Sequence, residues 1–223
     1  MPPPTELIET GDGSHSLYSP ELDETYHSRH GARQESQYVF IEKGLNFQKQ
    51  RNPKELLILE VGMGTGLNVW LTLEESKRAT LPIKMFTLEP YPISREIVNQ
   101  LNYAPSNKQK QEFLNIHEGP WEKWVKLNQY FMLYKTKTPV LDFKEGNNID
   151  LVYFDAFAPS KQKEMWELSL LSHIHQMMNI DGVFVTYCAQ GQFKRNLKSL
   201  GFEIESLEGP PGKMEMVRAI KVR

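Results

Sequence analysis

The stretch that decides the fold is Leu56-Leu57-Ile58-Leu59-Glu60-Val61-Gly62-Met63-Gly64-Thr65-Gly66. Its first six residues form an apolar run of strand length with one acid near the end, which is typical of a buried parallel strand. The glycines that follow let the backbone turn tightly and approach a ligand closely. Helical periodicity begins directly after them. Strand, glycine loop and helix N-terminus together predict a ligand-binding βα unit.

Beyond this unit, strand-length apolar runs alternate with helical segments, which predicts βαβ units and a mostly parallel sheet. The expected strands are Leu56–Val61, Lys84–Glu89, Ile149–Asp155, Val183–Tyr187, Phe202–Leu207 and Met214–Val222. Phe131–Lys135 and Pro139–Phe143 are expected to form a hairpin whose second arm joins the sheet, after an insert at Asn107–Leu127. The expected helices are Leu67–Arg78, Ile93–Leu101, Glu164–Met178 and Gln192–Leu200.

The end of the chain narrows the fold class. Only Gly209-Pro210-Pro211-Gly212 and its immediate neighbours separate the last two strands, which leaves no room for a crossover helix. The last strand must therefore run antiparallel to its predecessor. We expect an α/β, Rossmann-like fold of the class I methyltransferase type, with a mostly parallel seven-stranded sheet that ends in an antiparallel hairpin.

The N-terminal region has a different pattern. Glu6–Thr10 and Ser14–Ser19 flank a turn signal at Asp12-Gly13 and predict a hairpin. A helix is expected from Ala32 to Lys43, with Gly44 as its stop. We therefore expect an extension at residues 1–50, packed on a main domain at residues 51–223.

Composition excludes several classes of protein. With 39% hydrophobic and 24% charged residues, the 223-residue chain has the profile of a globular rather than a disordered protein. The net charge of −2 excludes a general polyanion binder, so any nucleic-acid contact must be local. The single Cys188 excludes an intrachain disulfide and fits a reducing compartment. Without a signal-peptide pattern or a membrane-spanning run, the expected location is the cytoplasm, away from membranes.

The glycine loop also constrains its ligand. Leu67 stands where a dinucleotide fingerprint requires its third glycine, and a Walker A lysine is missing from the loop. The carboxylate of Glu60 suits a cationic sulfonium and ammonium and would repel a pyrophosphate. Each acid at a strand end could be an ordinary solvated residue, but three at successive strand ends beside one glycine loop favour a bound cofactor. The cofactor predicted is S-adenosylmethionine, with Glu60, Gly62, Gly64 and Gly66 near its methionine part, Glu89 on the ribose and Asp142 on the adenine.

A second site is expected at Asp155. Its strand is predicted to neighbour the glycine-loop strand, at the sheet edge where ligands bind. Phe157 and Trp166 lie within a dozen residues of it. This combination suits an amine acceptor, because aromatic walls disfavour an ammonium ion and a carboxylate can take its proton. The carboxylate also stabilises the ammonium, so Asp155 is either a base, a group that orients the amine or a strand-end cap. His27 and His30, and His173 and His175, do not make a metal site, and no metal is expected.

One local basic run stands out. Lys194, Arg195 and Lys198 occur within Gln190–Leu200, a stretch without acids. Together with Lys213 at the Pro-Pro-Gly turn, they are either a nucleic-acid contact or an ordinary solvated helix face.

Several of these motifs occur together in a known family. Leu151-Val152-Tyr153-Phe154-Asp155-Ala156-Phe157-Ala158-Pro159, with Lys161, Met165 and Trp166, resembles the methyltransferase half of the MnmC-type enzymes that modify the wobble uridine of tRNA. Further similarity lies in Glu60 to Asn68, in Gly209 to Met216, and in the segment with Tyr26-His27-Ser28, Gly31-Ala32, Glu35-Ser36 and Tyr38-Val39-Phe40.

The resemblance implies methyl transfer from S-adenosylmethionine to the aminomethyl nitrogen of 5-aminomethyl-(2-thio)uridine in the tRNA anticodon. It adds Asn68 to the cofactor residues and Glu35 to the substrate-binding residues, beside Phe157, Trp166, Lys194, Arg195, Lys198 and Lys213. A chain ending at Arg223 resembles a stand-alone form without the family's flavin oxidase domain. Another enzyme would then supply the aminomethyl nucleoside.

Two alternatives use the same fold. A small-molecule amine methyltransferase or aminopropyltransferase would need no basic surface and would accept free amines. A non-catalytic subunit would bind S-adenosylmethionine without transferring its methyl group to any tRNA.

Overall fold

The sheet is built around β4 (Leu56–Val61), in a computed structural model that describes residues 4–223. β4 pairs in parallel with β5 (Ile83–Leu88) on one side and with β8 (Ile149–Phe154) on the other. β7 (Phe131–Thr136) and β9 (Met178–Thr186) continue the parallel region beyond them. The carboxyl ends of these strands therefore share one edge of the sheet, the edge at which open α/β sheets bind ligands.

Antiparallel strands complete the sheet on both sides. β11 (Glu215–Lys221) lies between β9 and β10 (Phe202–Glu208) and is antiparallel to both. β6 (Trp124–Asn128) pairs antiparallel with β7 at the opposite edge, so the order is β10-β11-β9-β8-β4-β5-β7-β6. The α/β class, the mostly parallel sheet and its antiparallel terminal hairpin are confirmed. Within residues 4–223 the sheet has eight strands instead of the expected seven, because β6 joins it.

The expected third strand was wrong. Phe131–Thr136 joins the sheet, whereas Pro139–Phe143 forms a turn in which the Asp142 amide donates to the Pro139 carbonyl at 2.9 Å. A proline lacks the N–H that a central strand must donate, which explains the preference for the earlier segment. The partner strand β6 was not predicted from the sequence because it is an edge strand without a buried apolar run. In it, exposed Trp124 and Lys126 alternate with only partly buried residues.

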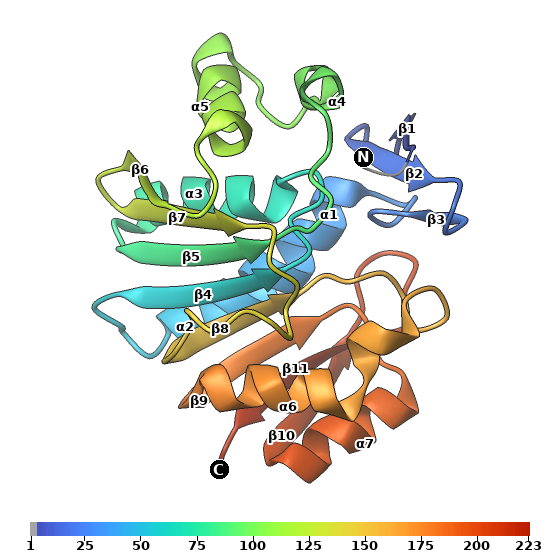
Figure 1. Ribbon diagram of the computed structural model, residues 1–223, viewed down its shortest axis with the longest axis vertical. Coiled ribbons are helices and arrows are strands. Elements are labelled where there is room, and N and C mark those ends of the chain that lie inside the picture. Colours follow the sequence, from blue (N-terminus) through green and yellow to red (C-terminus); the bar gives the residue numbers. More distant parts are fainter. Residues whose placement is uncertain (1–3) are drawn as a thin grey trace.

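Alternation along β4 separates two faces of the sheet. Leu56 and Ile58 point to a core shared with the π-helix η1 (Gln37–Leu45) and α3 (Leu67–Ala79). Leu59 and Val61 point to the opposite core, formed with α6 (Leu168–Met177) and α7 (Gly191–Leu200). Figure 1 shows the sheet between these helical layers. Because successive side chains point to opposite faces, Glu60 must face the side of α3.

The helix after Ala32 continues past its expected stop. α1 (Ala32–Ser36), η1 and α2 (Asn46–Lys49) follow one another without a break, so the prediction that Gly44 ends the helix was wrong. A Cβ atom at Gly44 would lie 3.0 Å from Val185 Cγ2, so the glycine allows the helix to approach β9 closely. Phe40 and Leu45 are buried in the same core as β4. The helical part of residues 1–50 thus packs inside the α/β core, and a boundary at residue 50 stays a prediction.

The first residues of the described chain form a separate small sheet. β1 (Glu6–Glu9) pairs antiparallel with β2 (His15–Ser19), as the hairpin prediction required, and β3 (Glu24–Thr25) adds a third strand. Figure 1 shows this sheet in blue, at the end of the molecule to which the parallel strands point. The extension therefore lies over the ligand-binding edge.

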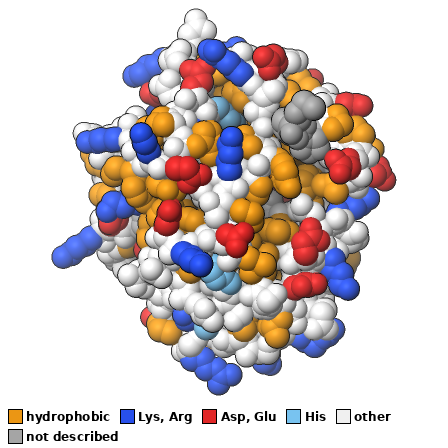
Figure 2. Space-filling view, in the orientation of Figure 1, with side chains coloured by type: hydrophobic (Ala, Val, Ile, Leu, Met, Phe, Trp, Pro, Cys, Tyr) orange, Lys and Arg blue, Asp and Glu red, His pale blue; other side chains and the backbone are white. Residues whose placement is uncertain are grey.

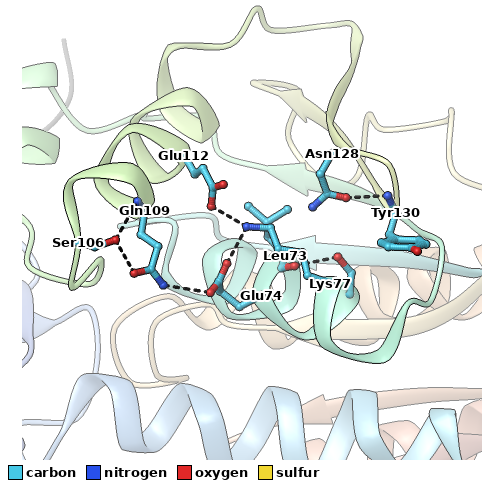
Figure 3. A network of polar contacts seen from close by, with 9 residues as sticks. Leu73, Glu74, Lys77, Ser106, Gln109, Glu112, Asn128 and Tyr130 are labelled. Carbon is cyan, nitrogen blue, oxygen red and sulfur yellow. Dashed lines mark hydrogen bonds and ion pairs between the residues drawn. The ribbon is translucent and has the colours of Figure 1, made fainter.

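The segment between β5 and β7 contains α4 (Arg95–Gln100), within the helix expected at Ile93–Leu101, and α5 (Asn107–Glu118), an unpredicted helix in the insert. Polar contacts hold α5 over α3, where Lys77 Nζ binds Glu74 at 2.9 Å and Glu112 at 2.6 Å (Figure 3). Gln109 donates to the same Glu74 at 3.3 Å. Within residues 4–223, no helix combines the length and the hydrophobicity needed to cross a bilayer.

We expect Gly44→Leu to lower the free energy of unfolding by about 1–3 kcal/mol, because the added side chain overpacks the contact with β9. Urea denaturation with an unchanged m-value measures this loss. Gly191→Leu is the matched control, since Gly191 is exposed at the start of α7 and a Cβ there meets only the Arg195 side chain at 3.4 Å. Equal stability of the two variants would contradict a close contact at Gly44.

Candidate active site

The glycine loop has a backbone conformation that would be strained for any residue other than glycine. Gly62, Gly64 and Gly66 have φ values of 88°, 50° and 77°, in the left-handed region. A Cβ at Gly62 would lie 2.7 Å from the Asp155 carbonyl oxygen, and one at Gly64 would lie 3.0 Å from the Tyr26 ring. The loop is thus in contact with the end of β8 on one side and with the N-terminal extension on the other.

Glu60 is a fully buried acid directly before this loop. It stands opposite Thr87 of β5 and Tyr153 of β8, and one carboxyl oxygen accepts the Thr87 hydroxyl hydrogen bond. Burial raises the pKa of Glu60 well above its usual range, the Thr87 hydrogen bond opposes this, and the Asp155 charge adds to it. A cation bound beside Glu60 would lower its pKa again.

Glu89 follows β5 and ties that strand to the glycine loop. Its Oε2 accepts the Gly64 amide at 2.9 Å and its Oε1 accepts the Tyr91 amide at 3.0 Å. Burial raises the pKa of Glu89, and these two amide hydrogen bonds oppose the rise. Each carboxylate oxygen keeps a free lone pair for a further donor, such as a ribose hydroxyl.

Asp155 lies at the carboxyl end of β8, on the face that Glu60 also occupies. Asn68, in the first turn of α3, donates from Nδ2 to Asp155 Oδ2 at 2.8 Å. Desolvation raises the pKa of the Asp155 carboxyl to about 7, with the Glu35 charge adding to the rise and the Asn68 hydrogen bond and Lys213 charge opposing it. Asp155 therefore changes its charge near neutral pH.

Glu35 and Lys213 meet across the chain, although 178 residues separate them. Lys213 Nζ forms an ion pair with Glu35 Oε1, and Glu35 Oε2 accepts the Ser28 amide at 2.7 Å. The ammonium also lies 3.6 Å from the centre of the Tyr187 ring. Both residues were predicted to bind substrate, and in the structure they bind each other beside Asp155.

Aromatic side chains cover the loop after Asp155. Phe157 packs edge-on against Tyr26, with ring centres 5.1 Å apart. Trp166 was expected in the same pocket, but it is 5% exposed and packs in the core against Phe154 and Phe193. Its indole N–H donates to the Phe157 carbonyl at 2.8 Å. Trp166 therefore supports the Phe157 loop from the core, and its contact with substrate stays a prediction.

The other predicted residues lie apart from this cluster. Asp142 is exposed in the turn after β7 and does not end a strand, so its adenine contact stays a prediction. On α7, Lys194 pairs with Glu215 at 2.9 Å, whereas Arg195 and Lys198 are exposed. Over the whole face drawn in Figure 2, basic side chains are interspersed with acidic ones. A contact between this face and a polyanion would therefore be local.

Three residues near Asp155 and the glycine loop were given no role in the site from the sequence. Tyr26 bridges Gly64 and Phe157, and Tyr187 donates from its hydroxyl to the Ala156 carbonyl at 2.8 Å. His27 is buried beside the Glu35–Lys213 pair, where desolvation lowers its pKa to about 4. Tyr26 and His27 lie in the N-terminal segment that resembles the MnmC family, and this resemblance was the only indication in the sequence that they belong to the site. Tyr187 directly follows β9, which pairs with β8, and only the pairing of the sheet makes this position significant.

The residues present fit S-adenosylmethionine. Among residues 4–223, Glu60 Oε1 and Asn68 Oδ1 are buried acceptor atoms without hydrogen-bond partners. An ammonium or sulfonium group is the kind of ligand that such atoms favour. A cavity of about 260 Å³ also opens between the N-terminal segment and α4, lined by Pro4, Thr5, Tyr26, Tyr91, Ile93, Ser94 and Ile97. It borders the segment that follows Glu89.

The fold and these residues define a methyltransferase. A family model described as "S-adenosyl-L-methionine-dependent methyltransferase" matches residues 95–222, more than half of the chain, and the chain belongs to this family. Its cofactor is S-adenosylmethionine, as predicted. The Streptomyces venezuelae protein DesVI, with 10% identity and a TM-score of 0.53 over 85% of this chain and 93% of its own, has a similar fold.

More specific similarity connects the chain to the MnmC proteins. It is 29% identical to the "tRNA 5-methylaminomethyl-2-thiouridine biosynthesis bifunctional protein MnmC" of Pseudoalteromonas atlantica, over 91% of this chain and 32% of that protein. The protein of the same name from Cupriavidus metallidurans is 27% identical over 97% of this chain and 34% of its own length. The chain thus spans about a third of these relatives. The crystal structure of MNMC2 from Aquifex aeolicus matches 99% of this chain and 71% of its own, with a TM-score of 0.82 and 25% identity.

We expect Gly64→Ala to weaken S-adenosylmethionine binding by roughly 100-fold, equivalent to about 2.7 kcal/mol, because a Cβ at this φ strains the loop and displaces Tyr26. Isothermal titration calorimetry measures the affinity. Gly13→Ala is the matched control: Gly13 also has a positive φ of 78°, but no atom lies within 4 Å of its Cβ position. Near-native affinity in Gly64→Ala would place the cofactor elsewhere.

Proposed function

We propose that the chain transfers a methyl group from S-adenosylmethionine to the aminomethyl nitrogen of 5-aminomethyl-(2-thio)uridine at the wobble position of tRNA. The observation that carries this proposal is Asp155, a carboxyl group that titrates near neutral pH beside a glycine loop and aromatic side chains. The printed name of the MnmC relatives supports the acceptor, because 5-methylaminomethyl-2-thiouridine is the N-methylated form of the aminomethyl nucleoside.

S-adenosylmethionine supplies an electrophilic methyl group when bound. The acceptor must be a neutral amine, and an alkylammonium with a pKa near ~10.4 must first lose a proton. The Asp155 carboxylate orients the amine and accepts that proton, and Asn68 holds the carboxylate in position through its hydrogen bond of 2.8 Å. Phe157 and Tyr26 exclude water and disfavour the charged amine.

The cofactor residues follow from the same arrangement. Glu60 and Asn68 offer their unpartnered oxygens to the methionine part, and Glu89 offers its remaining lone pairs to the ribose. Asp142 is assigned to the adenine, because it lies in the turn that follows β7.

The nucleic-acid partner is the anticodon region of tRNA. A wobble base can leave the stack and insert into an aromatic pocket, as single-stranded RNA bases do. Arg195 and Lys198, with their exposed side chains on α7, supply phosphate contacts. Such a substrate belongs to the cytoplasm, and an upstream tRNA-modifying enzyme must supply the aminomethyl group.

We expect Asp155→Asn to lower the single-turnover methyl-transfer rate by about 10²–10⁴-fold, because asparagine cannot accept a proton. The wild-type rate should rise as pH rises through about 7, since Asp155 is ionised only above its pKa. The variant should lose this rise. Rapid-quench assays with labelled methyl donor and tRNA from cells blocked at the aminomethyl stage measure both effects.

Phe157→Ala is the control for this experiment, and we expect it to weaken tRNA binding while leaving the pH dependence unchanged. Single-turnover rates of Asp155→Asn within about twofold of the wild type would show that Asp155 has no role in proton transfer. Turnover of free amines with no tRNA requirement would instead indicate the small-molecule methyltransferase.

We expect Arg195→Ala/Lys198→Ala to raise the tRNA dissociation constant and to flatten its salt dependence, because each lost phosphate contact lowers the slope by nearly one. Fluorescence anisotropy between about 50 and 200 mM salt measures the slope. Lys54→Ala/Lys84→Ala, at the amino-terminal ends of β4 and β5, is the matched control and should leave it unchanged. An unchanged slope in the α7 variant would exclude α7 as the docking surface.

A further inference from the structure

The segment from His30 to Tyr38 contacts the Pro-Pro-Gly turn near the other end of the sequence. His30 of the N-terminal segment packs on Gly212 of the Pro-Pro-Gly turn so closely that a Cβ there would lie 2.0 Å from His30 Cδ2. The Tyr38 hydroxyl donates to the Glu208 carbonyl at 3.1 Å, just before the same turn. These contacts bring Glu35 and Lys213 together.

The charge of Lys213 is neutralised by an acidic residue of the same chain. Its partner Glu35 has a side chain only 6% exposed, and the ammonium also lies 3.6 Å from the centre of the Tyr187 ring. A phosphate approaching Lys213 would meet the Glu35 carboxylate as well. An ammonium neutralised in this way is a weak phosphate ligand.

We propose that the Glu35–Lys213 ion pair is a positioning element for Asp155 and not a tRNA contact. It holds the Asp155 loop through Tyr187, and it tunes the charge of the Asp155 carboxyl through space. The inference rests on the proposed function, because it assigns the pair to the proton acceptor of that reaction.

The mechanical part of the proposal follows one chain of contacts. Glu35 fixes Lys213, and Lys213 packs on the Tyr187 ring. The Tyr187 hydroxyl donates to the carbonyl of Ala156, the residue after Asp155. Asn68 holds the Asp155 side chain. The backbone beside Asp155 and the Asp155 side chain are thus held by two separate contacts.

The electrostatic part has opposite signs for the two partners. Glu35 raises the pKa of Asp155 and Lys213 lowers it, and the Glu35 contribution is the larger. The other polar or titratable groups beside Asp155 are Glu60 of β4, Asn68 of α3 and Tyr187, which directly follows β9. His27 of the N-terminal segment faces the Glu35–Lys213 pair itself. Removing one member of the pair should therefore change the Asp155 pKa in a direction that depends on which member is lost.

The test is a ¹³C NMR titration of the Asp155 carboxyl carbon in the cofactor-free protein, with the signal identified by its loss in Asp155→Asn. Four proteins are compared: the wild type, Lys213→Met, Glu35→Gln and the double variant. The expected order of the Asp155 pKa, from the highest to the lowest, is Lys213→Met, wild type, the double variant and Glu35→Gln. At a pH well below the pKa, lowering the Asp155 pKa by about one raises the ionised fraction, and with it the transfer rate, about tenfold.

Lys84→Met is the matched control, because Lys84 pairs with Glu55 at 3.1 Å near the amino-terminal end of β5 and should not affect Asp155. Lys213→Met leaves the buried Glu35 unpaired, and this variant could fail to fold. In Glu35→Gln the remaining Lys213 side chain is 31% exposed and can be solvated, so this variant still tests the proposal. An Asp155 pKa in Glu35→Gln within about 0.3 of the wild-type value would overturn the proposal.

Binding and activity assays separate this inference from the proposed function. Loss of tRNA affinity with a flatter salt slope in Lys213→Met, without a change in the Asp155 pKa, would make Lys213 a phosphate contact and would refute the positioning role. Asp155 pKa values in the expected order, with no matching change in the pH dependence of methyl transfer, would support the pair and contradict Asp155 as the proton acceptor.

Discussion

The parallel pairing of β4 with β8 is the constraint on which the rest of the site depends. It places the ends of two strands side by side, so the glycine loop that follows one meets the acid that follows the other. The contact is tight, since any side chain at Gly62 would collide with the Asp155 carbonyl. Methyl donor and acceptor must meet with their reacting atoms aligned, and a fixed edge between two strands supplies that alignment better than mobile loops.

This arrangement brings several carboxyl groups together in a buried region of low dielectric. Glu60 and Glu35 are buried and Asp155 is largely covered. Burial raises the pKa values of Glu60 and Asp155, and the neighbouring carboxylates add to the rise. Asn68 and Lys213 each offset a part of this charge at Asp155. A buried ion pair contributes little net stability, so the Glu35–Lys213 pair is better explained by what it does to its neighbours than by the strength it adds.

The N-terminal extension is part of the site. It supplies Tyr26 against the glycine loop and Glu35 beside Asp155, and its helix packs in the main core. The Pro-Pro-Gly turn approaches from the other end of the chain and is joined to it through His30 and Lys213. Contacts from both segments bury Glu35 beside Asp155, and burial strengthens the electrostatic interactions between such groups.

The sequence by itself determined the βα unit at Leu56 to Gly66, the mostly parallel sheet around it, the antiparallel last strand and the class of cofactor. These features depend on local patterns, namely apolar runs, glycine spacing and the length of a turn. Only the tertiary structure decided that Phe131–Thr136, and not Pro139–Phe143, joins the sheet, and that Gly44 permits a close approach where a helix end was expected. It also placed Trp166 in the core beneath the Phe157 loop and joined Glu35 to Lys213. These outcomes depend on which distant segments pack together, and no local pattern in a single chain records that choice.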